Sequence, residues 1–113
     1  MSTVVRLLGP PHAQRRGGVL PRPRGRKPWA LLALVLASTG PVPRCRAQDL
    51  LFPDAEDPQA ALRWALSQAR RATGGAVQIG GDPLRHQLVG DTCVDVLDVL
   101  AGRAPDRWPA AEA

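Results

Sequence analysis

The sequence predicts an all-α fold: a small two- or three-helix domain at residues 48–113, preceded by a disordered basic leader at residues 1–47. Three observations predict this organisation. Residues 1–48 carry nine Arg or Lys and no acid, whereas all ten acids lie between Asp49 and Glu112. Proline and glycine interrupt residues 9–28 too often for a helix to propagate. Beyond residue 57, apolar side chains recur at a helical period.

The leader contains one continuous apolar run, residues 29–37, which stops at Ser38-Thr39-Gly40-Pro41. As a helix the run spans about 14 Å, roughly half of a bilayer core, so we expect no transmembrane anchor. Its length is typical of the apolar part of a secretory signal peptide. Small residues at Cys45 and Ala47 predict cleavage between Ala47 and Gln48, and hence a secreted protein.

Other interpretations of the leader stay open. Its many arginines and lack of acids also suit a mitochondrial presequence, the alternative location, although its prolines and glycines oppose the amphipathic helix that presequences need. A basic arm can bind nucleic acid by counterion release, but no aromatic ring interleaves with these arginines, so we do not expect a nucleic-acid partner. The simplest alternative is a disordered segment shaped by a GC-rich coding sequence.

The first helix of the folded part is expected over residues 58–73. Asp57 suits the N-cap and Pro58 the first helical position, while Gly74-Gly75 suits the C-terminal cap. An alanine-rich apolar stripe lies opposite the arginines, which favours packing against another helix. Trp64 lies toward the polar side, where we expect it to cover the segment Leu50-Leu51-Phe52 or else to anchor a partner.

The remaining residues predict one short strand and two further helices. Residues 76–79 read as a strand or an extended link between two glycine pairs. Asp82-Pro83 repeats the helix-start signal and predicts a helix to Val89, and helical periodicity resumes from Asp91 to Leu100. Trp108 lies in a tail, residues 103–113, that we expect to fray or to fold back onto the helices.

The glycines between residues 74 and 81 do not predict a nucleotide site. Gly75 and Gly80 have the spacing of a phosphate-binding loop, but Gly81 and Asp82 stand where that loop needs Lys and Ser or Thr. A carboxylate there would repel phosphate, so we interpret these glycines as turn residues.

No group of side chains predicts catalysis or metal binding, and we expect no cofactor. His86 and Cys93 are the one pairing that resembles a base and a nucleophile, but Gly90 interrupts the helix between them and Cys93 is expected to be a buried core thiol. The two cysteines and two histidines match no zinc-site spacing. Three aspartates on one helical face are expected to be solvated: Asp91, Asp95 and Asp98.

We therefore expect a small exported non-enzymatic protein that acts through helical contacts with a protein partner or a second copy. Only about 65 residues remain beyond the leader, which is a marginal size for an independent core. Trp64 and Trp108 are the candidate partner contacts. Two alternatives stay open: a truncated isoform or fragment of a larger enzyme that lacks the catalytic residues, and the product of a GC-rich open reading frame without selected activity.

Overall fold

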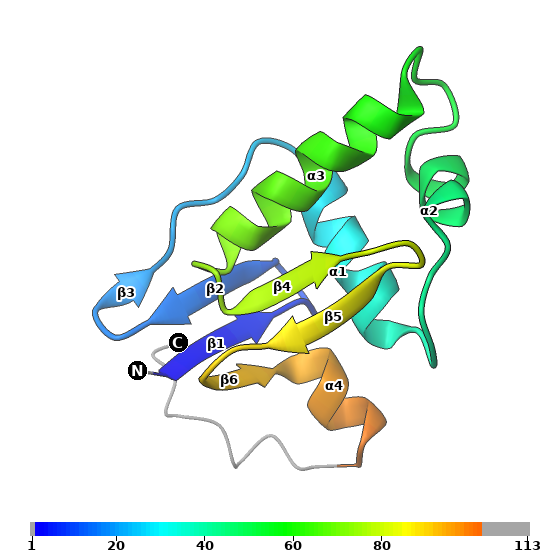
Figure 1. Cartoon of the computed structure of the whole chain (residues 1–113). Helices are drawn as coiled ribbons and strands as arrows, with labels where there is room; N and C mark the ends of the chain where they lie inside the picture. The colour runs from blue at the N-terminus through cyan, green and yellow to red at the C-terminus, as the bar shows by residue number, and fades with distance from the viewer. Residues whose placement is uncertain (1, 103–113) are drawn as a thin grey trace.

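The computed structural model describes residues 2–102 and shows a mixed α/β fold, 40% helical and 25% strand, so the prediction of an all-α domain is wrong. In chain order, three helices separate three N-terminal strands from a β-hairpin, which is followed by a last strand and a short helix (Figure 1). The elements are, in chain order, β1 Ser2–Arg6, β2 His12–Arg15, β3 Gly18–Val19, α1 Lys27–Ala37, α2 Arg44–Leu51, α3 Pro58–Ala72, β4 Val77–Gly80, β5 Arg85–Leu88, β6 Asp91–Val94 and α4 Asp95–Leu100.

The N-terminal residues form an antiparallel sheet, so the prediction of a disordered leader is also wrong. β2 pairs with β1 on one side and with β3 on the other. Arg16 and Gly17 make the turn between β2 and β3, and the φ angle of 98° at Gly17 is one that glycine adopts without steric cost. Val5 and Ala13 lie in the core, at 0% and 1% exposed.

Residues near the other end of the chain complete this sheet. β6 pairs in parallel with β1, with Ser2 opposite Asp91, and the strand order is β3-β2-β1-β6. The carboxylate of Asp95 accepts hydrogen bonds from the backbone N–H groups of Leu7 at 2.8 Å and Leu8 at 3.0 Å. The helix expected from Asp91 therefore begins only at Asp95, because the preceding residues extend along the edge of β1.

α1 is the central helix of the core. The apolar run of residues 29–37 lies within it, and Leu31, Leu32 and Leu36 are at most 1% exposed. α1 contacts α2, α3 and α4. The run that fits a signal peptide by length is thus packed inside the domain. Within residues 2–102, the structure contains no helix with the length and apolar character needed to cross a bilayer.

α3 begins and ends where the sequence predicts. The Oδ1 atom of Asp57 accepts a hydrogen bond from the backbone N–H of Ala60 at 3.0 Å, which confirms the N-cap. Gly74 and Gly75, at φ 62° and 82°, close the helix with backbone hydrogen bonds to its last turn. Arg15 of β2 donates hydrogen bonds from its Nη2 atom to the carbonyl oxygens of Thr73 and Gly74, at 3.4 and 2.9 Å, and so joins this end to the sheet.

β4 confirms the strand expected near residues 76–79, but β5 replaces the helix expected from Asp82 to Val89. The two strands pair antiparallel and form the hairpin. Leu84, just before β5, is fully buried and exchanges two backbone hydrogen bonds with Val42, of 3.0 and 2.6 Å. Leu84 and Leu88 have helical spacing, and pairing with β4 overrides it. Figure 1 shows α3 along the hairpin and α4 beside β6.

Candidate functional site

Between Asp49 and Gly102, the basic and the acidic side chains lie on different helices, strands and loops. The bases of this range all lie on α3 or β5, and all are exposed: Arg63, Arg70, Arg71 and Arg85. None of the acids of the range lies on α3, β4 or β5, although acids outnumber bases in it. We name as the basic surface the exposed side of α3 with the adjoining strand: Gln59, Arg63, Ser67, Arg70, Arg71, Arg85 and His86.

The outer face of α3 follows directly from its helical period. Leu62, Leu66 and Ala69 point into the core and are 0%, 5% and 0% exposed. At 100° per residue, Arg63 and Arg70 lie about 90° from this core-facing side, on one stripe with Gln59 and Ser67. The middle of the outer face, opposite the core, is occupied by Ala60, Trp64 and Arg71, and Trp64 is the bulkiest of the three.

The hairpin extends the basic surface beyond α3. A depression of about 510 Å³ is lined by Arg70 of α3 together with residues of β4 and β5, among them Arg85 and His86. Two guanidinium groups and an imidazole therefore border one hollow. Both arginine side chains are exposed, and within residues 2–102 neither makes a hydrogen bond or ion pair.

The start of α2 borders the other end of α3. A depression of about 340 Å³ is lined by side chains of both helices and of the hairpin turn: Arg44, Cys45, Gln48, Gln59, Arg63 and Asp82. Arg44 donates a hydrogen bond from Nε to the carbonyl oxygen of Gly81 at 2.7 Å, and its backbone N–H donates to Asp82 Oδ1 at 3.3 Å. These contacts hold the hairpin turn against α2, which fixes the hairpin relative to α3.

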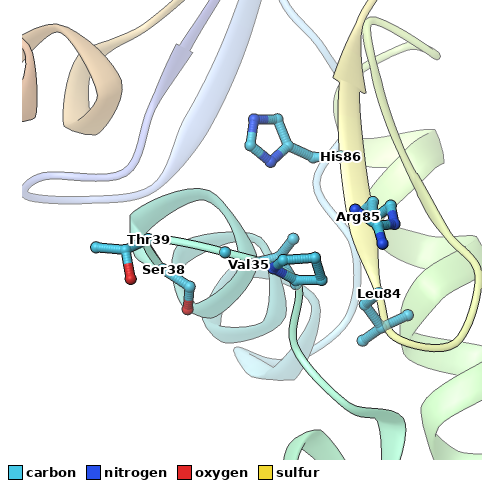
Figure 2. A pocket seen from close by; sticks show the side chains of 8 residues that line it. Val35, Ser38, Thr39, Leu84, Arg85 and His86 are labelled. Atoms are coloured by element: carbon cyan, nitrogen blue, oxygen red, sulfur yellow. The ribbon is translucent and has the colours of Figure 1, made fainter.

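A third depression, of about 270 Å³, lies on the side of β5 that faces α1. Figure 2 shows Arg85 and His86 on β5, with Ser38 and Thr39 at the end of α1 across from them. Ser38 donates a hydrogen bond from its hydroxyl to the carbonyl oxygen of Leu34 at 2.5 Å. Arg85 and His86 also border the depression that contains Arg70. These two side chains of β5 therefore line two different depressions.

The acids nearest to α3 are held at its start. Asp54, Glu56 and Asp57 lie in the segment between α2 and α3, and Asp57 is engaged as the N-cap. Negative side chains at a helix N-terminus stabilise the helix by opposing its dipole. No acid lies on α3 itself, although Asp82 of the hairpin turn borders the depression that contains Arg63.

The structure separates the residues that the sequence analysis singled out. Trp64 is 44% exposed on α3, in the middle of the outer face and beside the stripe of Arg63 and Arg70. Ala47 is 0% exposed in the middle of α2, with Gln48 next to it, so the predicted cleavage point lies inside a packed helix. Trp108 lies outside the described residues.

The structure also shows where the residues considered for catalysis or metal binding lie. His86 is exposed on β5 and Cys93 half-buried on β6, and Asp95 is engaged with the backbone of β1. Ser2 Oγ donates a hydrogen bond to Asp91 at 2.7 Å, so two of the three aspartates brace the sheet. Among residues 2–102 there is no group of three or more His, Cys, Asp or Glu side chains that could hold a metal ion.

The basic surface was not identified from the sequence. The sequence places the arginines of α3 opposite its apolar stripe, and only the structure shows that Arg85 of β5 joins them. The sequence does contain one signal for this surface: residues 58–80 include no Asp or Glu. In comparisons with known proteins, no family profile, no curated protein and no solved structure matches this chain.

Proposed function

We propose that this chain binds double-stranded DNA through the basic surface, with α3 in the major groove and the hairpin against the adjacent backbone. The observation that supports the proposal is the absence of acidic side chains from the two elements that hold the arginines of this surface. Among residues 2–102, four of the thirteen Arg and Lys lie on α3 or β5, and no acid lies on either element. Phosphate neutralisation by Arg and Lys supplies a large share of the affinity of proteins for duplex DNA, and an acid-free basic surface favours it.

The dimensions of α3 favour duplex DNA. Its 15 residues span about 22 Å at 1.5 Å per residue. The major groove of B-form DNA is about 12 Å wide and about 8.5 Å deep, and it admits an α-helix. The major groove of an RNA duplex is too narrow and deep for side chains to read, so the exposed face of α3 suits DNA better than RNA.

The order of elements explains how exposed arginines come together on one side. The β4–β5 hairpin follows α3 directly, β4 packs against α3, and Arg85 of β5 borders the same depression as Arg70. Topology alone does not determine function, so the proposal rests on the arginines.

The proposal revises the expectation of a protein without a nucleic-acid partner. That expectation concerned stacking of bases on a disordered arm, whereas residues 2–37 contribute three strands and a core helix. Cleavage between Ala47 and Gln48 would remove α1, against which α3 packs. Secretion, mitochondrial import, the absence of catalysis and a partner contact at Trp64 stay predictions, and DNA binding inside a cell requires the N-terminal residues to be retained.

The test is direct binding of the full chain to short duplexes. We expect fluorescence anisotropy with a 20-base-pair DNA duplex to show binding at 50 mM salt and clear weakening at 200 mM. An RNA duplex of the same sequence should bind more weakly. Failure to bind any DNA duplex at 50 mM salt, or tighter binding to the RNA, would contradict the proposal.

A further inference from the structure

Trp64 is an exposed aromatic side chain on the side of α3 that holds the basic surface. It lies in the middle of the outer face with Ala60 and Arg71, and it is 44% exposed. Within residues 2–102 it is the only large hydrophobic side chain exposed on α3, β4 or β5. Because burial of a large apolar side chain is favourable, an indole left in water on a binding face can gain free energy by contact with a ligand.

We propose that Trp64 reads a thymine in the major groove by packing its indole ring against the C5-methyl group of the base. This inference rests on the proposed function and deepens it by naming the residue that determines specificity and the base that it selects. The partner of the ring is anionic, because exposed arginines share α3 and β5 with it and no acid lies on either element. In the major groove of DNA, thymine presents its methyl group beside the O4 acceptor, and apolar side chains contact that methyl group.

The position of Trp64 on α3 directs it to the bases. Arg63 and Arg70 lie about 90° from the core-facing side, so they face the walls of a groove that holds the helix, where the phosphates lie. Trp64 lies on the side opposite the core, which faces the base edges at the groove floor. Arg71 shares this side near the helix end, and its charge suits a phosphate as well as a base. The indole of Trp64 is apolar apart from one N–H group, so its burial is most favourable against an apolar group, which the thymine methyl supplies.

The helical turn before Trp64 carries only small side chains on the same side. Side chains in an α-helix lean toward its N-terminus, over the residues three and four positions earlier. For Trp64 these residues are Ala60 and Ala61, which are small and uncharged. The indole ring therefore projects beyond the side chains of that turn and can reach a methyl group at the groove floor.

The test begins with selection of bound sequences by the full-length chain from a pool of random 20-base-pair DNA duplexes. We expect the wild-type protein to enrich a motif with a required thymine. In the selected duplex, uracil then replaces thymine at one position at a time, which removes only the methyl group and keeps the hydrogen bonds of the base pair. At the contacted position this change should lower the affinity of the wild-type protein by about 4-fold, the equivalent of about 0.8 kcal/mol for one buried carbon.

Two variants of Trp64 test whether its ring makes this distinction. Trp64→Ala should bind the thymine and uracil duplexes equally, because no ring remains to contact the methyl group. Trp64→Phe keeps an aromatic ring and should keep the preference for thymine. Alanine is favourable in an exposed helix, so Trp64→Ala should fold.

The matched control is Arg71→Ala, which should weaken binding to both duplexes alike and leave the ratio of their affinities unchanged. Four results would overturn the inference while leaving DNA binding intact: selection without a required thymine, equal wild-type affinity for thymine and uracil at every position, a thymine preference that survives in Trp64→Ala, or its loss in Arg71→Ala as well. Failure of the wild-type chain to bind the pool at 50 mM salt would instead remove the proposed function on which the inference depends.

Discussion

Replacing Arg70 and Arg85 together by glutamine tests how the basic surface holds a nucleic acid. Both guanidinium groups border one depression, and glutamine keeps a long polar side chain without the charge. If the four exposed arginines each neutralise one phosphate, log Kobs should fall with log[salt] with a slope of about −3.6, at about −0.9 per phosphate. The double variant should have a slope of about −1.8 because two contacts are lost.

These slopes predict a large and measurable difference. Between 50 and 200 mM salt the wild-type protein should lose about 150-fold in affinity, and the double variant about 12-fold. Fluorescence anisotropy with one DNA duplex over five salt concentrations measures both slopes. The control is Arg22→Gln with Arg24→Gln, which removes the same charge at exposed positions between β3 and α1. Equal slopes for the wild-type protein and the Arg70/Arg85 variant would refute the phosphate contacts, as would a matching change in the control.

Two further predictions concern the fold. Residues 48–113 alone should show no cooperative thermal transition by circular dichroism, because α1 and the first strands supply much of the core; a sigmoidal melt would contradict this. Gly74→Ala should lower the free energy of unfolding by about 1 to 3 kcal/mol, since φ is +62° and the new Cβ would lie 2.7 Å from the Arg15 guanidinium. Gly40→Ala, which meets no atom within 4 Å, should change it little, and equal effects in chemical denaturation would show that reasoning to be wrong.

Local signals identified α3 correctly because its boundaries depend on residues close in sequence. Asp57 caps the helix and Gly74 closes it, and both need only their own backbone neighbours. The same reasoning failed for residues 85–88. Leu84 and Leu88 have the spacing of a helix, but the segment pairs with β4, and the bridge from Leu84 to Val42 comes from a distant part of the chain.

The N-terminal strands were missed because turn residues were interpreted as breakers of all structure. Gly17 and Gly18 interrupt a helix, yet Gly17 is also the kind of residue that a tight turn between two short strands requires, and Gly18 begins the second strand. Composition added to the error, since many arginines without acids are typical of targeting segments. The burial of Leu31 and Leu32 between other elements cannot be read from the apolar run itself, because a signal peptide and a core helix of this length look alike.

The candidate site could be predicted only in part. The absence of acids from α3 is visible in the sequence, as is the helical stripe that contains Arg63 and Arg70. The contribution of Arg85 depends on a hairpin that the sequence did not predict. An interface assembled from a helix and a strand therefore needs the fold before its charge can be recognised.

The parallel pairing of β1 with β6 has a consequence for the order of events during synthesis. Residues 2–5 leave the ribosome before their partners, residues 91–94, because synthesis runs from the N-terminal side. This edge of β1 must therefore wait unpaired until residues 91–94 have emerged. We expect a nascent chain stalled before residue 90 to be sensitive to proteases and to attract chaperones, and a chain released after residue 102 to close its sheet.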